Sequence, residues 1–367
     1  MAVGDLFPSE SRNFTDRSTG RSLRQVTAHP SIHHPPYPYI AGYDDAMRRL
    51  IFISHRTGRP EIFAEIRSSG QLVQVTDHPT LAEWSIHPSH DGRYVYFTDA
   101  VGAWRADLET FRAECLADFR GAEIREAGMV GAAMGTTTLS HDDRWWAIPV
   151  KVGERSRFVV IDTISGKADS ILERDTIGHP EFHPNDSTLL RYAGPYHDRI
   201  WAINRDGTGN RLAFRRNSAK KEWIVHEAWL PGTREITAIN WPHGIIAVDV
   251  DSQTIRTISA FPAWHPAPNR RGTKLVLDTT YPDTGLWLTG AGSNQPAPQF
   301  LCRSDSSNGG THWGTDHCPY DDGPVKVNAP QHTHPHPSFS PDDSLVLFTS
   351  DSSGYAQLYE CAIGPNP

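Results

Sequence analysis

Several features that mark other classes of protein are scarce or missing in this sequence. Lys and Arg number 35 against 43 Asp and Glu, the formal net charge is −8, and no basic run reaches five residues, so nucleic acid is not expected as a partner. No apolar stretch approaches the length of about 18 residues that a membrane helix needs, so a membrane is not expected as a partner either. Residues 1–7 lack a basic region followed by an apolar core, which predicts a protein kept in the cytoplasm.

Cysteine is rare, and helical periodicity is hard to find. The four cysteines have neither zinc-ligand spacing nor the density of a disulfide scaffold; Cys302 and Cys318 bracket one polar segment, and whether they pair stays open. In place of a helical pattern, the chain repeats a unit of one aromatic or apolar residue, a turn rich in Pro, Asp, Asn or Gly, and a short β-rich apolar run. Seven copies occur, at residues 43–53, 86–97, 139–148, 182–190, 229–239, 268–277 and 339–348.

The spacing of these copies indicates the fold. Most intervals are about 40 to 50 residues, which is the length of a four-stranded propeller blade. Such blades bury their faces only against neighbouring blades, and closing the ring protects the sheet edges. The sequence therefore predicts an all-β fold, a seven-bladed β-propeller that forms a single domain over residues 1–367, with a polar insert at about 290–330 between the last two blades.

The most unusual segment is residues 331–336, Gln-His-Thr-His-Pro-His, which leads into the last apolar run. In an extended strand, residues two apart point to the same side, so His332, His334 and His336 are expected to share one face. Imidazole suits transition metals and an amide oxygen is a hard ligand, so Gln331, His334 and His336 are candidates to hold one divalent ion. The alternative is a Pro-rich and His-rich loop that binds no metal.

The repeat register brings further histidines to the same place. The first strand of each propeller blade lines the central channel, so equivalent positions form a ring. Counting back three residues from the anchor of each copy gives four consecutive histidines among the seven positions: Ile40, Glu83, Thr136, His179, His226, His265 and His336. We interpret this ring as functional; the alternative is that His simply suits a hydrated channel mouth.

The residue types suggest a chemistry for this ring. The predicted ligands are all neutral, so a bound divalent ion keeps its full charge and attracts an anionic oxygen of a substrate; these ligands are His265, Gln331, His334 and His336. If that oxygen belongs to a uronic acid carboxylate, the ion stabilises the enolate formed when the α proton leaves. His226 is the candidate base, and Arg199 is assigned to catalysis beside it. We assign His179, Arg215 and Arg216 to substrate binding.

The chain resembles the cytoplasmic oligogalacturonate lyases, which are seven-bladed propellers of polysaccharide lyase family 22. The matching segments are residues 16–21, 24–27, 198–207, 226–229 and 331–351, with the Gln-X-X-His-X-His spacing as the specific part. The resemblance implies a manganese site (Mn2+) at His265, Gln331, His334 and His336. It also implies that His226 removes the C5 proton during β-elimination of a small oligosaccharide substrate, giving monomeric unsaturated or keto-deoxy uronates.

Several points stay open at this stage. The segment 264–269 matches the family loosely, and His179, His183 and residues 312–318 have no counterpart, so another uronate is an alternative substrate, as in related propeller lyases that act on ulvan or rhamnosyl-glucuronate. A non-catalytic TolB-like propeller that binds or scaffolds is the alternative from a different class. An antibiotic-inactivating propeller lyase is a third, and the absence of a Gly-X-Ser-X-Gly motif argues against a prolyl-oligopeptidase-type hydrolase. The sequence does not fix exo or endo action, the proton donor or the oligomeric state.

Overall fold

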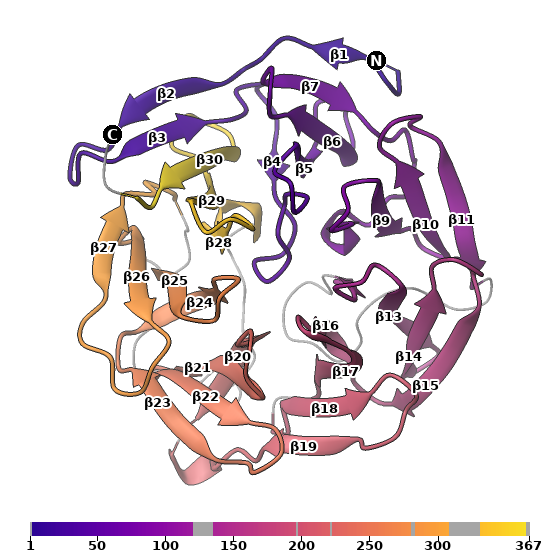
Figure 1. The fold of residues 1–367 in the computed structure, drawn as a ribbon, viewed down its shortest axis with the longest axis vertical. Coiled ribbons are helices and arrows are strands. Elements are labelled where there is room, and N and C mark those ends of the chain that lie inside the picture. Colours follow the sequence, from indigo (N-terminus) through magenta and orange to yellow (C-terminus); the bar gives the residue numbers. More distant parts are fainter. Residues whose placement is uncertain are drawn as a thin grey trace.

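The computed structural model describes residues 2–119, 135–195, 197–220, 222–279, 283–307 and 331–364. In this part of the chain, strands form seven antiparallel sheets that stand around a common centre, as Figure 1 shows. The predicted seven-bladed β-propeller is therefore confirmed. The same residues contain no α-helix, only the short 3-10 helices η1 (Glu83–Ser85), η2 (Ser218–Lys220) and η3 (Gln331–Thr333). None of the described helices is long and apolar enough to cross a membrane.

Five blades contain four strands each, ordered along the chain. Blade 2 consists of β8 (His87–Pro88), β9 (Tyr94–Thr98), β10 (Gly102–Asp107) and β11 (Ala113–Asp118). Blade 3 consists of β12 (Thr138–Leu139), β13 (Trp145–Val152), β14 (Arg155–Asp162) and β15 (Ala168–Arg174). Blade 4 consists of β16 (Gly178–His183), β17 (Asp186–Ala193), β18 (Ile200–Asn204) and β19 (Arg211–Phe214). Blade 5 consists of β20 (Trp223–Trp229), β21 (Glu235–Trp241), β22 (Gly244–Asp249) and β23 (Ile255–Ser259). Blade 6 consists of β24 (Ala263–Pro268), β25 (Lys274–Thr279), β26 (Leu286–Gly290) and β27 (Gln299–Cys302).

The N-terminal segment closes the ring by adding strands to the first and last blades. Blade 1 contains β4 (His33–His34), β5 (Arg49–Ser54), β6 (Glu61–Ile66) and β7 (Gln71–Gln74), with β1 (Leu6–Phe7) outside. Blade 7 contains β28 (Ser338–Phe339), β29 (Leu345–Ser350) and β30 (Gln357–Ala362), with β3 (Ser22–Gln25) and β2 (Arg12–Thr15) outside. In Figure 1 the indigo strands β2 and β3 lie beside the yellow strand β30.

A partly buried ion cluster fastens this closure. Arg24 on β3 pairs with Glu65 of blade 1 and with Glu360 of blade 7, the latter at 3.1 Å. Arg67 reaches the same two carboxylates, at 2.7 Å and 2.6 Å. Both glutamates are buried, so removing either arginine would leave a buried negative charge that is only partly neutralised. Such an unpaired buried charge strongly destabilises the folded state.

The apolar core lies between the blades. Seven clusters of buried side chains each join two neighbouring blades, so every junction in the described structure has its own core. Inner strands such as β5 and β29 are buried on both faces, which explains why the repeat carries continuous apolar runs. A smaller cluster of Tyr37, Ile40 and Trp84 lies inside the ring, where the loop after β4 reaches toward the centre in Figure 1.

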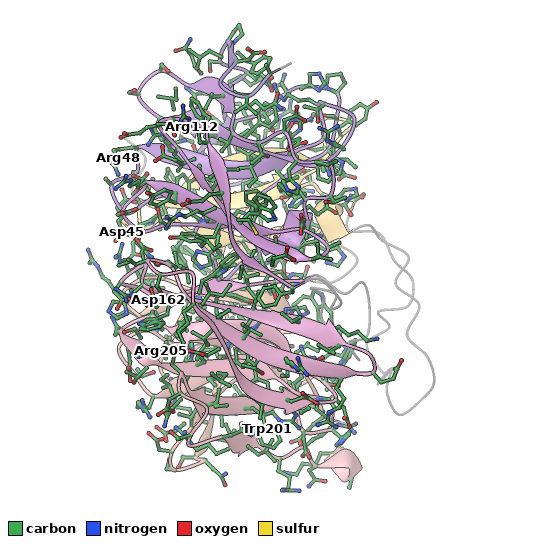
Figure 2. The ribbon with its side chains drawn as sticks, turned by 90° about the vertical axis from the view of Figure 1, so that its right-hand side faces the viewer. Asp45, Arg48, Arg112, Asp162, Trp201 and Arg205 are labelled. Carbon is green, nitrogen blue, oxygen red and sulfur yellow. The ribbon has the colours of Figure 1, made fainter. Side chains whose placement is uncertain are left out.

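The recurring Asp-rich turn links neighbouring blades on one face. Asp143 and Asp343 adopt the left-handed conformation, with φ of 57° and 61°, which Asp tolerates better than most residues. The Asp143 carboxylate accepts hydrogen bonds from His90 of blade 2, and the Asp343 carboxylate accepts one from Asn269 of blade 6 at 2.9 Å. Asp45 in the first turn pairs with Arg270 of blade 6 and lies on the left-hand face in Figure 2.

The insert expected at about 290–330 is only partly described. It begins with the last residue of β26 and contains β27, so its first part completes blade 6. Residues 308–330 lie outside the described part of the chain, and so does Cys318, so its pairing stays open. Cys302 is buried as a free thiol in the core between blades 6 and 7. The single-domain assignment for the whole chain stays a prediction.

His87 on the innermost strand of blade 2 makes the fold sensitive to acid. Burial, followed by the charge of His90, lowers the pKa of His87 from 6.5 to about 4. The unfolded chain therefore takes up a proton that the folded chain resists, so this contribution to stability is present above pH 6.5 and is lost as the pH falls through about 4. Between pH 7 and pH 5 the loss from this residue is about 2 kcal/mol.

The substitution His87→Asn tests this effect, because the amide can still donate to the carbonyl oxygen of Pro88 that His87 Nδ1 contacts at 2.9 Å. Urea unfolding at both pH values should show a smaller pH dependence in the variant, by about 2 kcal/mol. Equal pH dependence in the two proteins would show that His87 does not cause the acid sensitivity.

Candidate functional site

Four histidines from consecutive blades lie where the first strand, or the residue just before it, departs from regular β geometry. The first strands β16, β20 and β24 each have a register shift against the next strand, at or beside His179, His226 and His265. His179 and His226 have positive φ, 43° and 54°, and His336 just before β28 has φ of 45°. A bulge changes the direction of one side chain relative to the strand ladder. Because the bulges occur at equivalent positions of the repeat, these imidazoles lie at one level of the central channel. The ring centroids of His226 and His265 lie 4.2 Å apart, as do those of His265 and His336.

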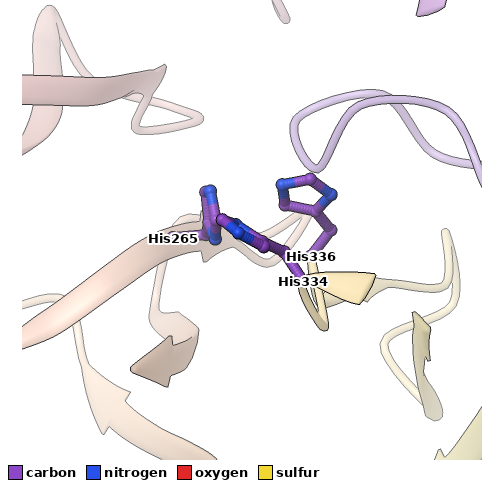
Figure 3. A group of neighbouring side chains, drawn as sticks. All are labelled: His265, His334 and His336. Atoms are coloured by element: carbon purple, nitrogen blue, oxygen red, sulfur yellow. The ribbon is translucent and has the colours of Figure 1, made fainter. Parts of the chain in front are cut away.

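Three of these imidazoles form a compact group that could hold a metal ion. The ligand atoms of His265, His334 and His336 all lie within 4.8 Å of one another, and the three residues are buried. Figure 3 shows the rings of the two segments, β24 and the residues before β28, turned toward one another. The group thus joins blade 6 to blade 7 across about 70 residues of sequence, including the undescribed stretch.

The carboxylate of Asp278 on β25 holds this group in place. It accepts hydrogen bonds from the backbone N–H of His265 at 2.7 Å and from His265 Nδ1 at 2.8 Å. It also accepts one from the backbone N–H of His336 at 3.2 Å. Because Nδ1 of His265 must carry the proton that it donates, its Nε2 presents a lone pair, as in carboxylate-histidine-metal arrangements.

The donor set fits a divalent transition metal. His336 Nε2 is buried and has no hydrogen-bond partner among the described residues, which is costly unless a ligand satisfies it. Burial, followed by the neighbouring His265, lowers the pKa of His336 well below 6.5, so the ring is neutral and able to coordinate. Imidazole nitrogens supported by a carboxylate are suitable ligands for manganese, zinc and similar ions.

The predicted ligand segment is not a continuous strand. Residues Gln331–Thr333 form the 3-10 helix η3 and not an extended strand, so the expectation that His332 shares one face with His334 and His336 is wrong. Prolines at 335 and 337 cannot donate to a ladder, and pairing begins only at Ser338. The side chain of Gln331 lies outside the described part of the chain, so its role as a ligand stays a prediction.

His226 lies beside the metal group with its two ring nitrogens in different surroundings. Its Nδ1 lies 3.0 Å from the hydroxyl oxygen of Tyr37, whereas its Nε2 is buried without a hydrogen-bond partner among the described residues. Burial, followed by His265, lowers the pKa of His226 well below 6.5. Burial, followed by the charge of Arg199, also lowers the pKa of His179 to about 3. Both rings are therefore neutral at pH 7.

The predicted arginines occupy different environments. Arg199 is buried and pairs with Glu227, with Nε 2.5 Å from the carboxylate, and its charge acts on both His179 and His226. Arg216 directs its Nε to the carbonyl oxygen of Glu222, and Arg215 is exposed after β19. Neither Arg215 nor Arg216 takes part in the hydrogen bonds described for the histidine ring, so their assignment to substrate binding stays a prediction.

Sequence reasoning missed Asp278 and Tyr37. Asp278 ends the apolar run 275–277, and a lone acid at the end of a buried strand is a signal that could have indicated a buried partner. The ring of Tyr37 lies 5.1 Å from that of His179 and 5.7 Å from that of His336. It comes from the Pro-rich segment 35–38, which precedes the first repeat and has no periodic signal.

Comparisons with known proteins are consistent with this geometry. A family model described as oligogalacturonate lyase matches residues 151–366. An oligogalacturonate lyase of Dickeya dadantii is 32% identical, with 98% of this chain and 97% of that protein covered. An oligogalacturonide lyase of Pectobacterium atrosepticum is 26% identical with the same coverage. A solved oligogalacturonate lyase in complex with manganese has the same fold, with a TM-score of 0.82 at 22% identity over 99% of each chain.

Asp278→Asn tests whether this carboxylate supports metal binding. The amide keeps the volume but removes the negative charge and can present a donor to His265 Nδ1, so the ring loses its fixed orientation. We expect the affinity for Mn2+, measured by calorimetry on the full chain, to fall about 10- to 100-fold. Asp283→Asn is a matched control, because this half-buried acid lies on the loop before β26 and contacts Ser304. Unchanged affinity in Asp278→Asn would exclude the supporting role.

Proposed function

Because the chain belongs to the oligogalacturonate lyase family, we propose that it cleaves short oligogalacturonides by metal-dependent β-elimination. The observation that supports this most strongly is the convergence of His226 with three ligand-type histidines, at 4.2 Å between the rings of His226 and His265. An elimination next to a uronate carboxylate needs two functions together: a positive charge on the carboxylate and a base near the carbon that carries the acidic proton.

The first function belongs to His265, His334 and His336, with Gln331 as the predicted fourth ligand. A divalent ion held there, which we take to be Mn2+, would neutralise the uronate carboxylate and stabilise the charge that develops as the C5 proton leaves. The chain contributes the neutral donor set, the carboxylate of Asp278 behind it, and a buried environment that strengthens electrostatic interactions.

The second function belongs to His226. For Nε2 to accept the C5 proton, Nδ1 must carry the ring proton, and the Tyr37 hydroxyl oxygen at 3.0 Å can accept that hydrogen bond. Tyr37 then acts as a positioning residue that selects the tautomer, in the way a carboxylate does for other catalytic histidines. The lowered pKa of His226 keeps it unprotonated and available at neutral pH, before the proton is transferred.

Arg199 and His179 complete the proposed site. Arg199 is fixed by Glu227, and this pair supplies a dipole beside the base without leaving an unpaired buried charge. His179 lies against Tyr37, with 5.1 Å between the ring centroids, and it can donate to or accept from a sugar hydroxyl. A cytoplasmic location stays a prediction from the sequence.

Two alternatives are less well supported. A TolB-like binding or scaffold propeller explains a polar channel, but it gives no reason for three buried imidazoles to share one centre behind a carboxylate. A lyase for another uronate would use the same chemistry, and it is distinguished by substrate alone. The family membership favours oligogalacturonide.

Paired substitutions separate the two functions. We expect His226→Ala to reduce turnover by about 100-fold or more, because a general base is removed, while the Mn2+ content is retained. His334→Ala should lose both turnover and metal. The assay is absorbance of the unsaturated uronate formed from di- and trigalacturonate, with metal content measured on the same samples. A His334→Ala protein that keeps full activity would remove the ligand assignment.

Tyr37→Phe is a finer test of the base, because it keeps the ring and removes only the oxygen that faces His226. We expect kcat to fall about tenfold, the value of one hydrogen bond, and the pH profile of kcat to shift, with little change in metal content. A variant that loses stability but keeps the wild-type kcat and pH profile would restrict Tyr37 to packing.

A further inference from the structure

A second group of metal-ligand side chains lies in blade 1 and at the start of blade 2. His34 on β4, His55 just after β5 and Glu83 in η1 have ligand atoms that all lie within 4.8 Å of one another. The Nε2 atoms of His55 and His34 lie 2.8 Å and 3.2 Å from the same carboxylate oxygen of Glu83. None of these residues is needed for the elimination chemistry proposed above.

The hydrogen bonds of His34 leave its inward-facing nitrogen without a proton in the neutral ring. His34 Nδ1 lies 2.9 Å from the carbonyl oxygen of Pro35, and a carbonyl only accepts, so Nδ1 carries the proton and donates it. In the neutral ring, Nε2 therefore presents a lone pair to the Glu83 carboxylate. Two acceptors facing each other at 3.2 Å repel, unless the ring is charged or a cation lies between them.

The residue types in this cluster indicate which ion would suit it. The cluster offers two imidazole nitrogens and one carboxylate oxygen. This donor set is typical of zinc sites that keep a coordination position open.

The surroundings separate this cluster from the first one and leave it accessible. Trp84 stacks on His34 at 4.1 Å between ring centroids, and its edge contacts the ring of His336 at 5.7 Å, so one indole lies between the two groups. The His55 and Glu83 side chains are 26% and 33% exposed, which leaves a route for an ion.

We propose that His34, His55 and Glu83 bind a second divalent transition metal ion of the zinc class, distinct from the ion at His265, His334 and His336. The backbone carbonyl of Pro35 accepts a hydrogen bond from Nδ1 of His34, as the Asp278 carboxylate does from Nδ1 of His265. In each case the proton is fixed on Nδ1, and Nε2 is left to face the metal site. The proposal concerns metal binding and does not depend on the lyase activity.

The test is the metal stoichiometry of the full-length chain. Protein stripped with a chelator, dialysed against Zn2+ and measured by mass spectrometry should contain about two ions per chain. The Glu83→Gln and His55→Ala proteins should each contain about one ion per chain. These positions are partly exposed, so the fold tolerates substitution there better than at the buried His34. His334→Ala should also contain about one, and the double variant His334→Ala with Glu83→Gln should contain about none.

A matched control is His90→Ala. His90 Nδ1 lies 2.6 Å from the Asp143 carboxylate with similar exposure, but His90 belongs to neither group of metal-ligand side chains in the described residues, so the variant should retain about two ions. A Co2+ titration followed by visible absorption should show the second binding step weakened about 100-fold or more in Glu83→Gln. Circular dichroism of the metal-free proteins checks folding.

Two results would overturn the proposal: a wild-type protein that binds a single ion, or a Glu83→Gln protein that keeps both. Because the readout is metal content and not turnover, neither result affects the proposed lyase function. Conversely, a protein inactive on galacturonides can still bind the second ion.

Discussion

The carboxylate of Asp278 fixes the geometry on which the centre of this propeller depends. It is fully buried, and it accepts hydrogen bonds from two groups of His265 on blade 6 and from the backbone of His336 on the approach to blade 7. Taking a carboxylate out of water costs several kcal/mol unless donors surround it, so the two blades must stay in register to satisfy it. The same contacts set the tautomer of His265 and leave its other nitrogen toward the channel.

The ring architecture explains how such a site can form from residues far apart in the chain. Blades 4, 5 and 6 each have a register shift in the first strand, and His179, His226 and His336 accept a left-handed backbone that costs about 1 kcal/mol or more for each residue. The neighbouring blades enforce that conformation through the apolar clusters at their junctions. The N-terminal strands β1 and β3 and the ion cluster around Arg24 then keep the first and last blades together, so the channel cannot widen.

Much of this arrangement could be predicted from the sequence, because a repeat carries its own register. The seven repeated turns predict seven blades. The position three residues before each repeat predicts that His226, His265 and His336 lie at one level of the channel, and in the structure their neighbouring rings are 4.2 Å apart. The failures have local causes. The strands β1 and β2 are short and largely exposed, so they have no apolar pattern, and residues Gln331–Thr333 form η3 in place of the expected strand. Asp278 and Tyr37 act through contacts with other blades or loops, which one sequence does not show.

The central claim is that blades 6 and 7 hold one divalent ion beside a catalytic histidine. The most direct measurement is anomalous X-ray diffraction at the manganese edge from crystals of the full chain grown with Mn2+. The account predicts a strong anomalous peak within coordination distance, about 2.2 Å, of the imidazole nitrogens of His265, His334 and His336. A peak located elsewhere, or none at these three residues, would contradict it.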